Sequence, residues 1–191
     1  MKRRVASGPP PKPTKAQLAA AVDIVVPDLI APNLRVLFCG INPGLYTAAI
    51  GHHFGRPDNR FWPALHQSGF TPRLFAPWEE HLLLDLGVGI TNLVKRTTAA
   101  ASSLSDDEYR EGSVRLASKA KRYNPKVIAF LGIGSYRVGF SRPKATLGLQ
   151  PEKLAGSALW VLPSPSGLNA NHQLSDLVQL FRELREWADV G

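Results

Sequence analysis

Leu34-Arg-Val-Leu-Phe-Cys-Gly-Ile-Asn-Pro-Gly44 is an apolar run that ends in a cluster of turn-forming residues. A short run rich in Val, Leu and Phe, bounded by Gly and Pro, is typical of a strand buried on both faces of a parallel sheet. Ligands of open α/β sheets bind beyond the carboxyl ends of such strands, where glycine lets the backbone approach closely. The stretch therefore predicts a functional site at its own end, with Asn42 projecting into it.

The side chain of Asn42 limits the chemistry of that site. Its amide carries a pair of donors and an acceptor, so it can bind the edge of a base or hold a water molecule. It cannot serve as a strong general base. We therefore expect a site that binds and orients, with little power to abstract a proton.

Further apolar strands alternate with helical segments along the chain. Strands are expected at 89–94, 126–131 and 158–162, and helices at 16–22, 60–69, 77–87, 105–123 and 173–187. The last helix places its apolar residues on one face, which should pack on the sheet. This alternation predicts a single α/β domain over residues 16–191, a three-layer α/β/α sandwich with a short, mainly parallel central sheet.

Length and composition suit one ordinary globular domain, because the chain has 191 residues, of which 44% are hydrophobic and 20% charged. No apolar run approaches the roughly 18 to 20 residues of a membrane helix. The residues after Met1 also lack the apolar stretch of a signal peptide. We therefore expect no membrane association and a cytoplasmic location, with the nucleoid as the site of action if the source is bacterial.

The single cysteine, Cys39, restricts the cofactors that the chain can hold. It allows no internal disulfide and cannot by itself bind zinc or an iron–sulfur cluster. At the end of a buried strand it is expected to behave as a small hydrophobic residue.

Asp106 and Asp107 could suggest a metal site, but their place in a first helical turn favours an interaction with the helix dipole. We expect no metal and no cofactor.

The charge distribution favours a polyanionic partner. The formal net charge is +8, with a sequence pI near 9.9. Residues 1–15 hold five basic residues and no acid, so +5 lies there and +3 remains for residues 16–191. This basic, proline-rich tail is expected to be disordered. It is either an arm that adds non-specific affinity for phosphates or a solvated tail with no dedicated role.

Four segments of the chain resemble one enzyme family. Gly40-Ile-Asn-Pro-Gly44 resembles the first motif of the mismatch-specific uracil-DNA and thymine-DNA glycosylases, and Leu162-Pro-Ser-Pro-Ser-Gly-Leu-Asn169 resembles the second. Asn59-Arg-Phe-Trp62 and Gly89-Ile-Thr-Asn-Leu-Val94 also resemble family segments, in the family's order. The resemblance covers about 28–187, and four segments in order are more specific than one pentapeptide.

The resemblance implies a uracil-DNA glycosylase-like fold and a hydrolase of DNA base excision repair. The enzyme would take uracil, or thymine or a damaged pyrimidine, mispaired with guanine, out of double-stranded DNA and hydrolyse its N-glycosidic bond with water. An abasic site would remain, and the protein would act as a monomer. No lysine is placed as an evident Schiff-base nucleophile, which favours a monofunctional enzyme without strand cleavage.

The resemblance also implies roles for residues around the first motif. Phe54 would stack on the flipped base, and such stacking hardly distinguishes one base from another. The pyrimidine edge would then be recognised at the backbone of Gly40, Ile41 and Asn42, with Thr47 close by. Specificity is expected to come from these hydrogen bonds.

The strand expected at 89–94 adds two candidates. If it runs parallel to the first strand, its polar end reaches the same cleft. Asn92 is then a candidate for binding the substrate and Lys95 for contacting DNA. The alternative for Lys95 and Arg96 is a solvated loop.

The second motif resembles a loop that fills the hole left by a flipped nucleotide. Leu168 would be the wedge, and Gly167 and Asn169 would offer polar groups to the opposite base, with Ser166 beside them. Ser164 would bind the flipped sugar or phosphate. Without the resemblance, a leucine after glycine in a loop is more often a buried anchor.

Two features of the chain depart from the family pattern. The family often has a basic residue at the position of Ala170, so Asn171 or His172 would have to replace its contact to the opposite strand. Related uracil glycosylases have Asp where this chain has Asn42, which leaves water positioning in place of base catalysis and predicts slow turnover. His52 and His53 are candidates for acid or electrostatic assistance, or else plain surface residues.

Two other functions compete with this hypothesis. The first is a binding module of the same fold that recognises mispaired or damaged DNA with little catalysis, which the amide of Asn42 makes conceivable. The second is an enzyme that binds a small nucleotide through Gly132-Ile-Gly134. That segment lacks the third glycine of a dinucleotide fingerprint, since Arg137 stands there, and a tight strand-to-helix turn explains it better.

Overall fold

The computed structural model describes residues 8–190. Residues 1–7 of the basic tail expected to be disordered therefore lie outside the described residues, whereas 8–14 contain neither helix nor strand. Lys15, the last residue of that expected tail, already belongs to the first helix. Within 8–190, no helix combines the length and the hydropathy needed to cross a bilayer.

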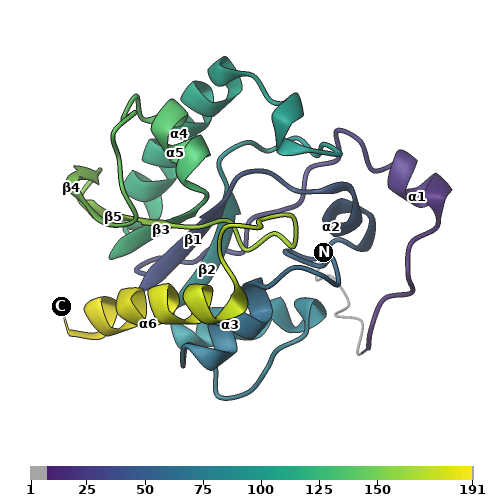
Figure 1. Cartoon of the computed structure of the whole chain (residues 1–191), viewed down its shortest axis with the longest axis horizontal. Helices are drawn as coiled ribbons and strands as arrows, with labels where there is room; N and C mark the ends of the chain where they lie inside the picture. Colours follow the sequence, from purple (N-terminus) through teal and green to yellow (C-terminus); the bar gives the residue numbers. More distant parts are fainter. Residues whose placement is uncertain (1–7, 191) are drawn as a thin grey trace.

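A five-stranded sheet forms the centre of the molecule (Figure 1). Its strands are β1 (Val36–Gly40), β2 (Val88–Asn92), β3 (Val127–Leu131), β4 (Gly148–Leu154) and β5 (Ser157–Leu162). They lie in the order β2-β1-β3-β5-β4, and only β4 runs antiparallel to its neighbour. The predicted α/β fold with a short, mainly parallel sheet is confirmed.

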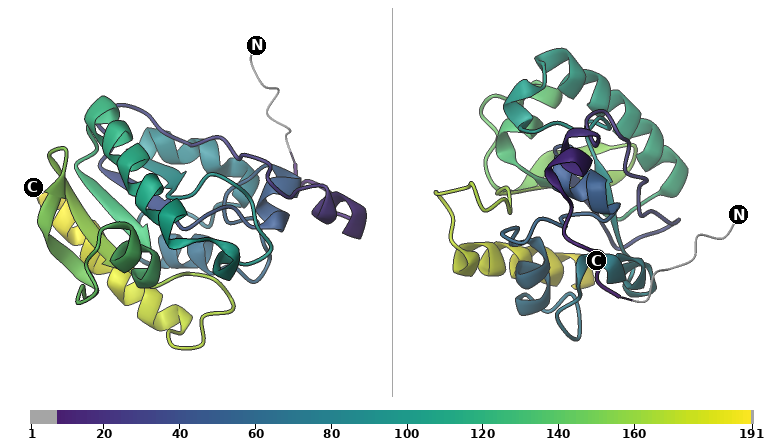
Figure 2. Two further views of the ribbon diagram at one scale, coloured as in Figure 1. Left: turned by 90° about the horizontal axis from the view of Figure 1, so that it is seen from above. Right: turned by 90° about the vertical axis from the view of Figure 1, so that its right-hand side faces the viewer.

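Helices cover both faces of this sheet (Figures 1 and 2). They are α1 (Lys15–Ala19), α2 (Leu45–Ile50), α3 (Phe61–Gln67), α4 (Asp106–Tyr123), α5 (Ile133–Gly139) and α6 (Leu174–Val190), with two 3₁₀ helices, η1 (Pro77–Leu86) and η2 (Ala101–Ser103). Helices α3, α6 and η1 pack on one face, and α4 and α5 on the other. The sandwich therefore has the predicted three layers.

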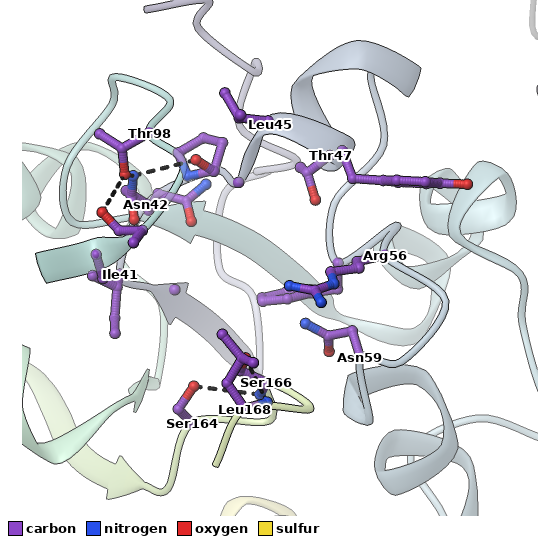
Figure 3. Close-up of a pocket in the computed structure, with 18 of the residues that line it drawn as sticks. Ile41, Asn42, Leu45, Thr47, Arg56, Asn59, Thr98, Ser164, Ser166 and Leu168 are labelled. Carbon is purple, nitrogen blue, oxygen red and sulfur yellow. Dashed lines mark hydrogen bonds between the residues drawn. The ribbon is translucent and has the colours of Figure 1, made fainter. Parts of the chain in front are cut away.

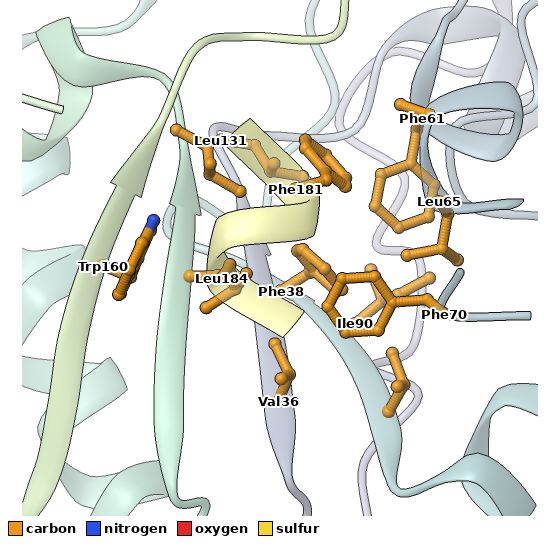
Figure 4. Close-up of a cluster of buried hydrophobic side chains, with 14 of the residues drawn as sticks. Val36, Phe38, Phe61, Leu65, Phe70, Ile90, Leu131, Trp160, Phe181 and Leu184 are labelled. Carbon is orange, nitrogen blue, oxygen red and sulfur yellow. The ribbon is translucent and has the colours of Figure 1, made fainter. Parts of the chain in front are cut away.

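The alternation of side chains along β1 explains why its sequence is apolar throughout. Phe38 points into the layer of α3 and α6, where it stacks on Phe181 at 5.5 Å between ring centroids and meets Phe61 edge-on at 5.3 Å (Figure 4). Leu37 and Cys39 point into the layer of α4 and α5. Every residue of β1 is buried, as expected for an inner strand of a parallel sheet.

Local signals placed most helix boundaries correctly. Ser105 caps α4 in a reciprocal capping box with Glu108, and the helix ends at Tyr123 as predicted. The segment 77–87, predicted as a helix, is a 3₁₀ helix rather than an α-helix. Asp106 and Asp107 lie exposed in the first turn of α4 and pair with Arg110, in line with the dipole interpretation.

Neither edge of the sheet is left as a plain open strand. β4 carries Pro151 and an irregularity in its pairing with β5 between Leu149 and Lys153. At the opposite edge, Leu29 and Ile90 of β2 exchange backbone hydrogen bonds of 2.9 and 2.8 Å. The connector before β1 therefore covers part of the β2 edge.

Candidate active site

A cavity of about 700 Å³ opens at the carboxyl end of the parallel strands (Figure 3). This volume lies in the range of small-molecule sites. The predicted residues that line it are Gly40, Ile41, Asn42, Thr47, Phe54, Asn92, Ser164, Ser166, Leu168 and Asn169. Lys95 and Gly167 do not line it. The two motifs, more than 100 residues apart in the sequence, therefore meet at one cavity, as expected from parallel strands.

The end of β1 lets an aromatic ring and an amide meet beneath the cavity. A Cβ atom at Gly40 would lie 2.6 Å from Oδ1 of Asn92 and 3.5 Å from the ring of Phe54, so only glycine fits between them. The ring of Phe54 stacks on Phe61 with centroids 4.1 Å apart. Phe54 is thus supported from the core while it also lines the cavity.

The amide of Asn92 has no hydrogen-bond partner among the described residues and keeps some of its surface open to the cavity. Its residue is 8% exposed, and within 8–190 no hydrogen bond of its side chain is formed. Buried polar groups are normally hydrogen-bonded, so an unpaired amide in a cavity wall is suited to a polar ligand. By contrast, the carbonyls of Gly40 and Ile41 already accept hydrogen bonds of 2.9 Å from Leu93 and Val94.

The amide of Asn42 is held in one orientation. Its Nδ2 donates to Oγ1 of Thr98 at 2.8 Å and to the carbonyls of Arg96 and Pro43 at 3.1 and 3.2 Å. The Thr98 hydroxyl donates its own proton to the carbonyl of Ala100 at 2.9 Å, so it can only accept from Asn42. The nitrogen therefore faces the 96–98 segment, and within the described chain Oδ1 has no hydrogen-bond partner, which leaves it available to a ligand.

The 96–98 segment is anchored by an ion pair. Arg96 binds both carboxylate oxygens of Glu108, with Nε–Oε1 2.5 Å and Nη2–Oε2 3.1 Å, and also the carbonyl of Ser103. The hydrogen bonds from Arg96, with a further one from the backbone of Ser105, lower the pKa of Glu108 to about 2. Arg96 is therefore a support of the site, whereas its neighbour Lys95 is exposed, as in the solvated-loop alternative.

The two histidines after α2 are structural partners of the site. His53 is 2% exposed, its Nε2 lies 3.0 Å from the carbonyl of Pro27, and its backbone N–H donates to Glu80 at 2.8 Å. Nδ1 of His52 lies 3.0 Å from the other oxygen of Glu80. The interpretation of both as plain surface is wrong for His53, which lines the cavity. Because a carbonyl oxygen only accepts, Nε2 of His53 carries the proton.

Thr47 joins α2 to the loop that carries Phe54. It is 8% exposed, and its Oγ1 accepts a hydrogen bond of 3.3 Å from the backbone of Gly55. Its hydroxyl proton has no acceptor among the described residues. Thr47 therefore shapes the cavity and retains one donor.

The loop after β5, residues 164–172, is called the wedge loop below. Leu168 is 76% exposed at its tip, so the interpretation as a buried anchor is wrong. The side chain of Asn169 is used inside the loop, because Nδ2 donates to the carbonyl of Ser164 at 2.9 Å and Oδ1 accepts from Asn171 at 3.1 Å. Asn169 thus braces the loop, and its amide reaches an opposite base only if these bonds break.

Several residues of the site were not found from the sequence. Thr98 orients Asn42, Leu18 of α1 lines the cavity, and Arg60 binds the wedge loop. Leu18 of α1 and Leu168 of the wedge loop therefore line the same cavity. The segment Asn59–Trp62 was singled out, but nothing local in it indicates that Arg60 has partners more than 100 residues away.

The glycines after β3 do not form a ligand site. Neither Gly132 nor Gly134 lines the cavity, and Gly132 is the N-cap of α5. The predicted tight turn from strand to helix is confirmed. In 8–190, no group of three or more His, Cys, Asp or Glu side chains is placed to hold a metal ion.

Two comparisons with known proteins bear on this chain, one on its family and one on its fold. The family model described as the uracil DNA glycosylase superfamily matches residues 27–187. A solution NMR structure from Methanosarcina acetivorans, provisionally described as a uracil DNA glycosylase, superposes with a TM-score of 0.57 at 21% sequence identity. The match covers 86% of this chain and 99% of that one, and at this identity it shows a shared fold.

Proposed function

The chain belongs to the uracil-DNA glycosylase superfamily, and from this premise we propose that it removes uracil mispaired with guanine from double-stranded DNA. Thymine and damaged pyrimidines in the same mismatch are further candidate substrates. The reaction hydrolyses the N-glycosidic bond with water and leaves an abasic site. The protein acts as a monofunctional glycosylase and as a monomer.

The orientation of Asn42 is the observation that carries this proposal. Three acceptors surround its nitrogen, so Oδ1 is presented to the cavity as an acceptor in a fixed place. An acceptor held in this way orients a water molecule for attack on the sugar carbon that bears the base. Positioning of this kind accounts for a large part of many enzymatic rate enhancements.

The composition of the cavity wall favours a slow reaction, whose rate depends on how readily the base leaves. No Asp or Glu of the described chain lines the cavity, so no carboxylate is at hand to take a proton or to stabilise a cationic sugar. No lysine of the described chain lines it either, which favours the monofunctional reaction over Schiff-base chemistry. The base must therefore leave readily, as uracil and electron-poor pyrimidines do.

Phe54 and Asn92 form the proposed base pocket. The flipped base stacks on the cavity side of Phe54, whose other side rests on Phe61. The unpaired amide of Asn92 donates to and accepts from the pyrimidine edge. Stacking supplies affinity for any base, and the amide supplies the preference for a pyrimidine.

Leu168 is the proposed wedge. A flipped base leaves a gap in the stack, and an apolar side chain that enters the gap offsets part of the lost stacking. Leu168 is exposed, apolar and at the cavity rim, opposite the side that holds Asn42 (Figure 3). A mispaired uracil costs least to extrude, which is the physical basis for the proposed preference for G·U pairs.

Single-turnover cleavage of a labelled duplex with one G·U pair tests the proposal. Alkali treatment reveals abasic sites, so the wild-type protein should give strand breaks only after alkali. Asn42→Ala should lower the rate by about 100- to 1,000-fold, because the water loses its acceptor. Binding without base release from G·U, G·T or single-stranded uracil would overturn the proposal.

That last outcome would favour a DNA-binding module of the same fold. One observation speaks for this second candidate: the described cavity wall lacks any carboxylate. Such a module would still bind mismatched duplex more tightly than matched duplex. The same assay, combined with a binding titration, therefore distinguishes the two functions.

A further inference from the structure

The wedge loop is held by the guanidinium group of one half-buried arginine, Arg60. Nη1 of Arg60 donates to the carbonyl of His172 at 2.5 Å, and Nη2 donates to the carbonyls of Ser166 and Asn169 at 2.5 and 2.9 Å. The backbone N–H of Arg60 donates to the carbonyl of Pro165 at 2.9 Å. One residue therefore binds four carbonyls, two on each side of the tip that carries Leu168.

Among the described residues, the guanidinium group of Arg60 forms hydrogen bonds only to the wedge loop. No ion pair of Arg60 with a carboxylate is formed within 8–190, and the nearby Asp58 pairs with Arg56 at 2.8 Å. Nε of Arg60 is buried and has no hydrogen-bond partner. A planar fork with several donors in fixed directions can bind three carbonyls at once, which a lysine ammonium group on a flexible stem cannot do in the same geometry.

The segment before Arg60 also packs directly against the wedge loop, at Gly167. A Cβ atom at Gly167 would lie 2.6 Å from Oδ2 of Asp58 and 2.8 Å from its carbonyl oxygen, so the loop rests directly on this segment. Above these contacts, Leu168 makes no comparable packing and stays 76% exposed. The base of the loop is thus fixed and its apolar tip is free.

We propose that Arg60 is a positioning residue that acts through Leu168: it holds the wedge loop in the conformation that enters the duplex. The inference rests on the proposed function, and it adds a residue that neither touches the base nor the attacking water. A loop fixed in its bound shape loses less entropy on binding than a mobile one. Arg60 should therefore matter for extrusion of the nucleotide and not for the bond cleavage that follows.

A double-mutant cycle on the G·U duplex tests this role. Arg60→Lys keeps the charge and loses the fork, and we expect single-turnover cleavage to fall by about 10- to 30-fold. In the Leu168→Ala background the same change should cost less than about threefold, because residues that act through one another are not additive. Arg73→Lys is the matched control, since Arg73 pairs with Glu79 on the exposed surface away from the cavity, and it should leave the rate unchanged.

Hydrogen exchange tests the role of Arg60 independently of whether the protein cleaves DNA. Hydrogen exchange of the amides in 166–171 should become faster in Arg60→Lys, while the amides of β1 and β3 keep their protection. If the wild type binds the duplex without cleaving it, the cycle is read from dissociation constants instead, with the same expected non-additivity. Three results would overturn the role of Arg60. They are additive losses in the double mutant, unchanged hydrogen exchange of the loop in Arg60→Lys, and a cleavage rate of Arg60→Lys within twofold of wild type.

Discussion

The loop after β1 and the wedge loop after β5 lie at the same end of the sheet, yet they are held in opposite ways. Asn42 is fixed at its side chain, by acceptors from its own loop and from the 96–98 segment. Leu168 is free at its side chain and fixed only through the backbone beneath it, by Arg60. Orienting a water molecule requires an exact atom position, whereas filling a gap in DNA requires an apolar tip in the right place. Each loop is therefore fixed where its proposed task requires it, Asn42 at its side chain and Leu168 at the backbone beneath it.

Of the three changes that separate the two loops, Asn42→Asp should have the largest effect, and it tests whether the chemistry depends on the neighbours of this side chain. A carboxylate is a better base than an amide, but it has no N–H to donate, and it would face the oxygens of Pro43, Arg96 and Thr98. We expect cleavage of the G·U duplex at neutral pH to fall by about 100-fold, because buried acceptors left unpaired are costly and the site geometry shifts. Single-turnover rates of Asn42→Asp and wild type on the G·U duplex measure this fall. A variant faster than wild type would show that the surrounding acceptors do not matter and would remove the contrast between the loops.

A smaller effect is expected from Leu168→Ala, which tests the other loop. The change should slow cleavage of the duplex by about 10- to 30-fold through the lost wedge. Because Leu168 is exposed, the free energy of unfolding should change by no more than about 0.5 kcal/mol. Single-turnover kinetics measure the change in cleavage rate, and thermal unfolding measures the change in stability. A clear loss of stability would mean that Leu168 packs on the protein in solution.

The smallest effect is expected from Thr98→Val, which removes one acceptor of Asn42 while keeping the shape of the side chain. We expect kcat to fall by about 5- to 10-fold with KM nearly unchanged, because the amide loses part of its orientation and the base pocket is untouched. Thr98→Ser should restore the wild-type rate. Steady-state kinetics on the G·U duplex measure this split. A change confined to KM would indicate that Thr98 contacts the substrate directly.

The framework of the fold could be predicted from the sequence because its signals are local. Val36–Gly40, at the predicted first strand, is buried on both faces, and the capping box at Ser105 starts a helix where predicted. β4 was missed, because Gly148–Leu154 carries a proline and alternates irregularly between buried and exposed residues. An edge strand with few buried side chains gives little periodic signal.

The candidate site was predictable only as far as its motifs reach. Asn42, Phe54 and Asn92 were found because each follows a strand end or stands in a family segment, and all three line the cavity. The supports of the site were not found. Arg60 bonds to His172 across 112 residues, and Asn42 bonds to Thr98 across 56. Such pairs carry no local pattern, because the two partners lie far apart in the sequence and meet only in the folded chain.

The irregular edges of the sheet have a consequence for the behaviour of the protein in concentrated solution. An exposed edge with a regular row of backbone donors and acceptors is a template for strand addition and aggregation. Pro151 interrupts that row on β4, and the connector at Leu29 occupies part of it on β2. Chains that meet edge to edge therefore find no continuous ladder to extend, and the sheet resists growth into fibrils.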